Sequence, residues 1–176
     1  QRELNDWWRD RLQREYGLES VLELEFETHF SRFLMPTVRG SEKGSKKRYA
    51  GVVESGGAPR LVFKGLENVR TDWTQLAREF QSELYRRVFA GEPFEDYLRD
   101  LVGRVEAGEL DEQLVYRKRL RRRLDHYERN LPPHVQAARL ARSRGGTPPA
   151  RGDWVEYVIT TAGAEPVADA RSALDY

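Results

Sequence analysis

The chain has 176 residues, of which 39% are apolar and 34% charged, so it can form the core of one ordinary domain or of two small ones. The absence of cysteine excludes disulfides, thiolate zinc sites and thiol nucleophiles, and it fits a reducing, cytoplasmic compartment. No apolar run approaches the ~20 residues that span a bilayer and no signal peptide opens the chain, so no membrane partner is expected.

Charge is balanced in total but separated along the chain. The net charge is +1, from 30 basic and 29 acidic residues. Residues 92–112 hold eight acids against two arginines, whereas residues 114–123 hold six basic residues and no acid. Separate acidic and basic blocks are typical of a protein that contacts a polyanion with one face.

The first part of the chain predicts one helix followed by antiparallel strands. Apolar residues four apart predict an amphipathic helix from Arg2 to Tyr16 that ends at Gly17. Val21 to Phe30 then alternates with period two and predicts a half-buried strand, followed by a bend near residues 31–32. Residues 38–46 predict a polar turn. Lys47 to Glu54 and Arg60 to Lys64 predict short strands around a Ser55–Gly56–Gly57 turn.

The second part is richer in helices. Apolar stripes over 73–88 and 94–105, with Gly91 and Gly108 after them, predict two antiparallel helices joined as an αα-hairpin. A short helix is predicted from about Pro133 to Arg142 and a strand from Trp154 to Thr160. The expected fold class is therefore α+β, with a change from sheet to helix near residue 73.

Carboxylates on the predicted strand 21–30 raise the question of a metal site. Glu23, Glu25 and Glu27 would share one face, where they could hold a hard cation or form the solvated side of the strand, and the solvated side is the preferred interpretation. His29 continues that face, and His126 and His134 have no acid and nucleophile at catalytic spacing. No nucleophile-elbow, metalloprotease or phosphate-loop motif occurs, so the sequence predicts no catalytic residue and no metal ligand.

The segment GSKKRYAG places three cations, Lys46, Lys47 and Arg48, directly before Tyr49. It can be an ordinary solvated turn or a nucleic-acid contact. Strand alternation would put Lys47 and Tyr49 on one face, where both could donate hydrogen bonds. The minor groove of duplex DNA offers acceptors in every base pair, so such donors need not depend on sequence.

A second basic stretch runs from Tyr116 to Arg123. It can be a cationic helix or one arm of a hairpin, and its cations repel one another unless a polyanion or the acidic block offsets them. We expect Arg117, Arg119 and Arg122 to contact phosphates without regard to sequence.

The order of the motifs along the chain is also informative. LELEFETHFSRFLM, GSKKRYAG, VFKGLENVRTDW, LVYRKRLRRRLDHYERNLPPHVQAARL and GDWVEYVITTAG follow one another. This order resembles the C-terminal part of the bacterial polymerase II group of family B DNA polymerases, over almost the whole chain. Because the chain opens at Gln1 and ends at Tyr176 without a closing helix, we expect an excised piece of such an enzyme.

The resemblance implies a palm end over residues 1–73, followed by a thumb over 74–176 that closes on primer–template duplex DNA. It implies minor-groove contacts from Lys47 and Tyr49 and places the strand glutamate that neighbours the family's metal site at Glu27. The motif GLExVRxDW maps onto Gly65, Glu67, Arg70 and Asp72, beside the primer strand, and the resemblance implies DNA contacts from Gly65, Glu67 and Arg70 as well as from Arg48 of the preceding motif.

The two aspartate motifs by which the family holds its metal ions, DxxSLYP and YxDTDS, are not present in the 176 residues. The resemblance therefore implies Mg²⁺ and deoxynucleoside triphosphates for a parent DNA-directed DNA polymerase, bound through other parts of it. It also implies a sliding-clamp contact through a tail beyond Tyr176. The piece itself is expected to be inactive. The alternative is a non-catalytic module that binds nucleic acid or an acidic protein partner.

Overall fold

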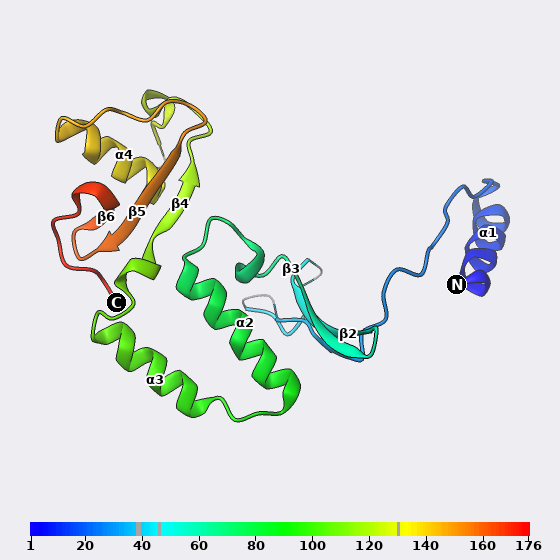
Figure 1. Ribbon diagram of the computed structural model, residues 1–176. Coiled ribbons are helices and arrows are strands. Elements are labelled where there is room, and N and C mark those ends of the chain that lie inside the picture. The colour runs from blue at the N-terminus through cyan, green and yellow to red at the C-terminus, as the bar shows by residue number, and fades with distance from the viewer. Residues whose placement is uncertain (38–39, 46, 130) are drawn as a thin grey trace.

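The computed structural model describes residues 1–37, 40–45, 47–129 and 131–176, so the predicted DNA contact Lys46 lies outside the described residues. In that part of the chain, helices combine with two antiparallel sheets (Figure 1), which confirms the expected mixture. The helices are α1 (Arg2–Tyr16), α2 (Gln75–Ala90), α3 (Glu95–Glu106) and α4 (Pro133–Ser143). The strands are β1 (Arg32–Leu34), β2 (Tyr49–Ser55), β3 (Ala58–Lys64), β4 (Tyr116–Arg119), β5 (Trp154–Thr160) and β6 (Gly163–Pro166).

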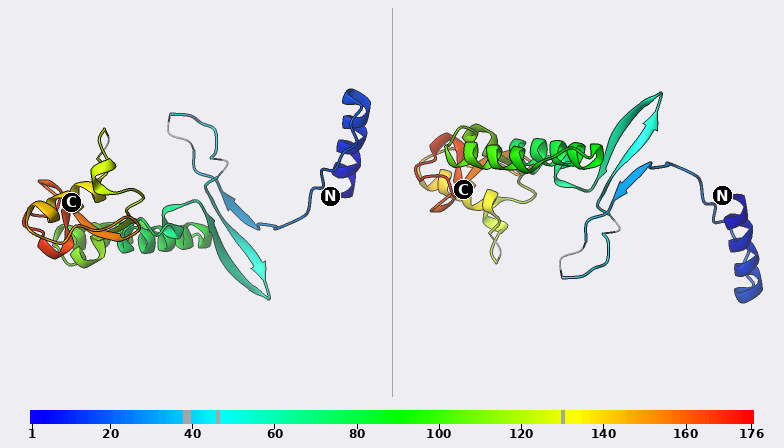
Figure 2. Two further views of the ribbon diagram at one scale, coloured as in Figure 1. Left: turned by 90° about the horizontal axis from the view of Figure 1, so that it is seen from above. Right: turned by 90° about the horizontal axis from the view of Figure 1, so that it is seen from below.

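Helix α1 has the predicted bounds and stands apart from the rest of the molecule (Figure 2). It ends because Gly17 adopts a left-handed conformation with φ 64°, and the Gly17 N–H donates to the Gln13 carbonyl at 3.0 Å. No residue of the helix is buried, and Leu4 and Trp7 remain about half exposed. The apolar stripe that predicted the helix is therefore uncovered here.

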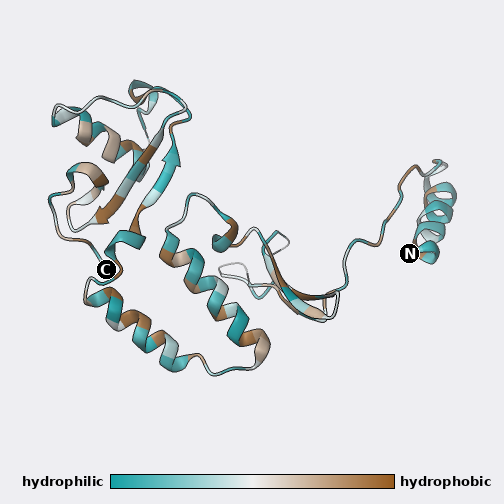
Figure 3. Ribbon diagram, in the orientation of Figure 1, coloured by the Kyte–Doolittle hydropathy of each residue, from teal (hydrophilic) through white to brown (hydrophobic). Residues whose placement is uncertain are grey.

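The strand predicted for Val21 to Phe30 is wrong. Residues 17–30 are irregular, and the side chain of Asn5 holds this segment by exchanging two hydrogen bonds with the backbone of Leu24, at 2.8 and 3.1 Å. Val21 is 98% exposed and Phe26 71%, and Figure 3 shows hydrophobic colour along this uncovered chain. Alternation determines which side chains share a face, but a strand also needs a neighbour for its backbone groups, and no described strand pairs with this segment.

The first sheet has the order β1-β2-β3 and contains the predicted hairpin, with slightly different bounds. Strand β2 begins at Tyr49 rather than Lys47, and β3 begins at Ala58 rather than Arg60. The two glycines of the turn Ser55–Gly57 have φ 63° and 86°. A two-residue hairpin turn of type I′ requires positive φ at both central positions, which glycine adopts readily. The chain bends just before β1, as predicted.

Helix α2 supplies part of the core of the first sheet. The buried residues of this core are Ala50, Val52, Leu66 and Phe89, with Leu34, Leu61, Phe63 and Tyr85 packed around them. Phe89 and Tyr85 belong to α2, and the rings of Phe63 and Tyr85 meet edge to face at 5.6 Å. The sheet-rich and helix-rich parts of the sequence therefore share one hydrophobic core.

The predicted αα-hairpin is confirmed by helices α2 and α3 (Figure 1). Thr74 begins α2 by accepting a hydrogen bond from the Ala77 N–H at 3.2 Å, and Gly91 ends it with φ 71°. The stacked rings of Phe80 and Tyr97, 6.3 Å apart, join the two helices. No helix in the described part of the chain is long and apolar enough to cross a membrane.

The second sheet has the order β4-β5-β6, and α4 packs on β5 and β6. The basic stretch from Tyr116 therefore begins as strand β4, which decides between the two structures that the sequence left open. Helix α4 and strand β5 were predicted correctly, whereas β6 was not predicted. The core consists of Leu120, Leu124, Val135, Ala137, Ala138, Val155, Tyr157 and Ala164.

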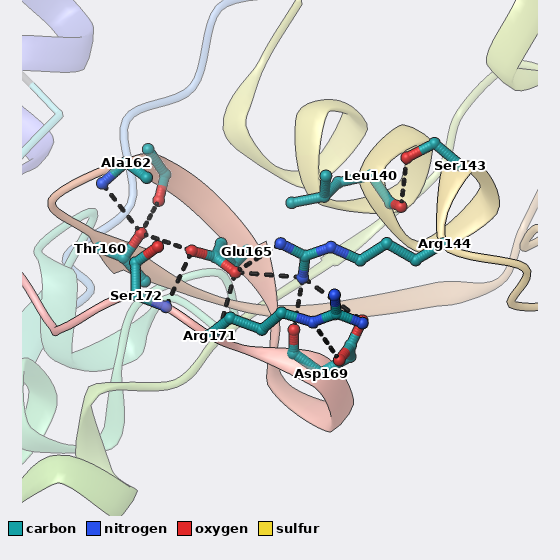
Figure 4. Close-up of polar contacts among 10 residues, drawn as sticks. Leu140, Ser143, Arg144, Thr160, Ala162, Glu165, Asp169, Arg171 and Ser172 are labelled. Atoms are coloured by element: carbon teal, nitrogen blue, oxygen red, sulfur yellow. Dashed lines mark hydrogen bonds and ion pairs between the residues drawn. The ribbon is translucent and has the colours of Figure 1, made fainter.

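A buried carboxylate on β6, Glu165, contacts several segments around the second sheet (Figure 4). Glu165 is 2% exposed and accepts hydrogen bonds from the Arg144 guanidinium, from the backbone N–H groups of Arg171 and Ser172, and from the Thr160 hydroxyl, at 3.0–3.2 Å. These bonds lower the pKa of Glu165 from 4.5 to about 2, and the bond from Ser172 has the largest effect. Burial opposes the change. The ionised carboxylate thus connects α4, the second sheet and the C-terminal segment.

Substitution of Glu165 by Gln is expected to lower the thermal unfolding midpoint by several degrees at pH 7, because the amide leaves Arg144 and one backbone N–H short of an acceptor. The folded pKa lies below the unfolded one, so this stabilisation is complete above about pH 4.5 and disappears as the pH falls toward 2. Urea unfolding at pH 7 and pH 3 measures the change.

The exposed Glu156 on β5 provides the matched control, because Glu156→Gln changes the same chemistry at the surface. The gap in unfolding free energy between wild type and Glu165→Gln should narrow from pH 7 to pH 3. Equal stability of the two at pH 7 would contradict the role given to Glu165.

Candidate nucleic-acid interface

Tyr49 opens strand β2 and lies against two other rings. Its ring centroid is 5.8 Å from that of Phe30 and 5.4 Å from that of Phe33, and these three residues form what we call the aromatic cluster. Gly51 makes room for it, because a Cβ there would clash with the Phe30 ring. The sequence predicts that strand alternation places Lys47 on the face of Tyr49. Lys47 is exposed but precedes β2, so strand alternation does not apply to it.

Gly65 brings the two motifs GSKKRYAG and KGLENVRTDW into contact. It has φ 65°, and a Cβ at this position would clash with the carbonyl oxygen of Lys47. Both the conformation and the close approach require glycine. The contact gives Gly65 a positioning role, and the DNA contact predicted for it stays a prediction.

Arg48 is paired with Glu67 rather than free. The Glu67 carboxylate accepts from the Arg48 guanidinium and, at 2.7 Å, from the Gln81 amide, whose oxygen accepts from the Asn68 N–H at 2.9 Å. Burial raises the pKa of Glu67, but the bonds from Gln81 and Arg48 outweigh it and hold the pKa below its ordinary value. These contacts anchor the start of β2 to helix α2, and DNA contacts by Arg48 and Glu67 remain predictions.

Asp72 joins the segment before α2 to strand β4. It accepts two hydrogen bonds from the Arg70 guanidinium, at 2.9 and 2.8 Å, and the Lys118 ammonium lies 3.5 Å from its second oxygen. The hydrogen bonds from Arg70, with a smaller contribution from Lys118, lower the pKa of Asp72 to about 2 against the effect of burial. The carboxylate is therefore ionised at neutral pH and holds two cations side by side.

These contacts border a surface groove of about 620 Å³ that we call the basic groove. Five of its side chains are cationic and one is acidic. Among the described residues, Arg119, Arg121 and Arg151 have no acidic partner within ion-pair distance. The full lining is Arg70, Thr71, Asp72, Lys118, Arg119, Leu120, Arg121, Arg151, Gly152 and Trp154. Such an excess of unpaired cations suits a polyanion.

Backbone hydrogen bonds bring Arg151 to the basic groove. The Gly152 N–H donates to the Leu120 carbonyl at 2.8 Å, and the Leu120 N–H donates to the Asp153 carbonyl at 3.0 Å. The phenol oxygen of Tyr127 accepts from the Arg121 N–H at 3.2 Å and fixes the chain that follows β4. The two bonds of the Leu120 backbone join segments about thirty residues apart, so no local pattern revealed the contribution of Arg151.

The arginines predicted for DNA contact in the GLExVRxDW motif and in the basic stretch divide into two groups. Arg70 and Arg119 line the basic groove, and Arg117 lies on the same strand as Arg119. Arg122 is exposed but does not line the groove. Sequence patterns did not single out Lys118, Arg121, Arg151 and Trp154, although the first two belong to the basic stretch that they identified.

The carboxylates of the 21–30 segment do not form a site. Glu23, Glu25, Glu27 and His29 are exposed on irregular chain. The described residues contain no group of three His, Cys, Asp or Glu side chains placed to hold a metal ion. They therefore do not fit a Mg²⁺ site.

Comparison with known proteins gives a consistent result. The family model described as DNA polymerase family B matches residues 13–174. DNA polymerase II of Escherichia coli is 56% identical over 98% of this chain, which spans 23% of that protein, and a DNA polymerase of Archaeoglobus fulgidus is 33% identical over 77% of the chain, spanning 16%. A solved family B DNA polymerase from Pyrobaculum calidifontis matches 97% of the chain, and 22% of its own, with 26% identity and a TM-score of 0.55. The chain therefore belongs to DNA polymerase family B.

Proposed function

We propose that this chain holds primer–template duplex DNA as the palm end (residues 1–73) and thumb (74–176) of a DNA-directed DNA polymerase. The observation that carries the proposal is the basic groove with three arginines that have no acidic partner among the described residues. Family membership supplies the class of polyanion. Nucleotidyl transfer, its Mg²⁺ ions and its deoxynucleoside triphosphates belong to other parts of the polymerase, because the residues described here offer no carboxylate cluster.

Phosphate binding in the groove would be independent of base sequence. A guanidinium presents two parallel N–H donors to a phosphate, and each neutralised phosphate releases condensed counterions from the duplex. Arg119, Arg121 and Arg151 are exposed and free of competing carboxylates among the described residues, so they can bind phosphate without breaking an ion pair. A polymerase needs this kind of contact because it must bind templates of any base sequence.

Tyr49 is the proposed contact with the base pairs near the primer end. The rings of Phe30 and Phe33 pack against the Tyr49 ring, so the phenol O–H is a hydrogen-bond donor held in one place. Purine N3 and pyrimidine O2 accept hydrogen bonds in every base pair of the minor groove. Such a donor would check the shape of a pair without reading its identity, and exposed Lys47 would add a positive charge nearby.

The salt dependence of duplex binding tests the basic groove. We expect log Kd for a fluorescein-labelled primer–template duplex to rise steeply with log[NaCl] between roughly 50 and 200 mM. Arg119→Gln combined with Arg121→Gln should weaken binding and reduce the slope by about 0.9 for each phosphate that the variant no longer neutralises. Fluorescence anisotropy provides both quantities.

Arg99→Gln is the matched control, because Arg99 on α3 is exposed and pairs with Asp96 far from the groove residues in sequence. It should leave the slope unchanged. A wild-type Kd that does not respond to salt, or equal slopes for wild type and the groove variant, would contradict duplex binding by the groove.

Tyr49→Phe tests the minor-groove donor, since it keeps the ring against Phe30 and Phe33 and removes only the O–H. The loss of one hydrogen bond should raise Kd for the primer–template about fivefold. The difference should shrink on a duplex whose purines near the primer end are 3-deaza analogues, which lack the N3 acceptor and leave only the pyrimidine O2 acceptors. Equal affinity of the two proteins for the ordinary duplex would refute the contact.

A further inference from the structure

Two arginines and one tryptophan form a stack on the outer face of the second sheet. Arg117 and Arg119 are two residues apart on β4 and therefore share one face of the sheet. Trp154 lies directly opposite Arg119 on β5. The guanidinium carbons of Arg117 and Arg119 lie 4.6 and 5.0 Å from the centroid of the Trp154 ring. Trp154 is 39% exposed, so the stack lies at the surface.

The stack holds like charges close together. Two guanidinium groups that approach one ring repel each other, and the negative face of the indole offsets part of that repulsion. Arg117 has a further partner, Glu156, at 3.4 Å, whereas Arg119 has no acidic partner within ion-pair distance among residues that the structure describes. For Arg119, the ring is therefore the main attraction that limits its rotamers.

Trp154 also stands where two grooves meet. It lines the basic groove together with Arg119, and it lines a neighbouring groove of about 330 Å³ together with Arg117. One ring thus contacts one cation in each groove. A flexible arginine loses side-chain entropy when it binds a phosphate, and a guanidinium that is already held against a ring loses less.

We propose that Trp154 is a positioning residue that holds the guanidinium groups of Arg117 and Arg119 in place for backbone phosphates of duplex DNA. The inference rests on the proposed duplex binding and adds a residue that contributes no charge to it. Trp154 acts through the two arginines rather than by stacking on a base, because both guanidinium groups already lie within 5.0 Å of the ring centroid.

A double-mutant cycle tests this role in the 176-residue chain. Trp154→Leu should raise Kd for the labelled primer–template about three- to tenfold at low salt. In a chain that already carries Arg117→Gln and Arg119→Gln, the same substitution should change Kd less than about twofold, because nothing is left to position. Trp154→Phe, which keeps a weaker ring face, should give an intermediate Kd and covers the case in which the leucine variant fails to fold.

The possible outcomes separate the two proposals. An equal effect of Trp154→Leu in both backgrounds would overturn the positioning role and leave duplex binding intact. A Trp154→Phe variant with the affinity of the leucine variant would also overturn it. If Arg117→Gln with Arg119→Gln leaves Kd and its salt slope unchanged in the otherwise wild-type chain, duplex binding by this surface fails, and the positioning role fails with it.

Discussion

In our account, the proposed DNA-binding surface depends on the contacts of the Asp72 carboxylate with Arg70 and Lys118. It accepts two hydrogen bonds from Arg70, which follows the first sheet, and faces Lys118 of the second sheet at 3.5 Å. Its pKa of about 2 keeps it ionised at any physiological pH, so both cations stay attracted to it. One acid thus contacts two of the five cations that line the groove.

The segment from Gly65 to Asp72 connects the two parts of the proposed interface. At its start, Gly65 lies against the backbone of Lys47, next to the aromatic cluster that holds Tyr49. In its middle, Glu67 pairs with Arg48 and accepts from Gln81 of α2. At its end, Asp72 reaches β4. In the proposed function this arrangement serves one purpose, because a duplex offers phosphates and a minor groove at the same time.

Sequence alone predicted those features that local periodicity determines. Helices α1, α2 and α3 and strand β5 follow from apolar spacing and from glycines such as Gly17 and Gly91. The strand over residues 21–30 failed because pairing requires a neighbour that alternation does not supply. Of the basic groove, the sequence indicated the basic stretch and, through the motif resemblance, Arg70 and Asp72. Arg151 and Trp154 reach it through pairing across about thirty residues, which no local pattern reports.

The duplex affinity of Asp72→Asn at low salt tests most directly whether Asp72 organises the groove. Simple charge counting says that removing one acid from a basic groove tightens the binding of a polyanion. We predict the opposite, a higher Kd than wild type, because Arg70 and Lys118 lose their shared anchor. A lower Kd for Asp72→Asn than for wild type would contradict the organising role of this carboxylate.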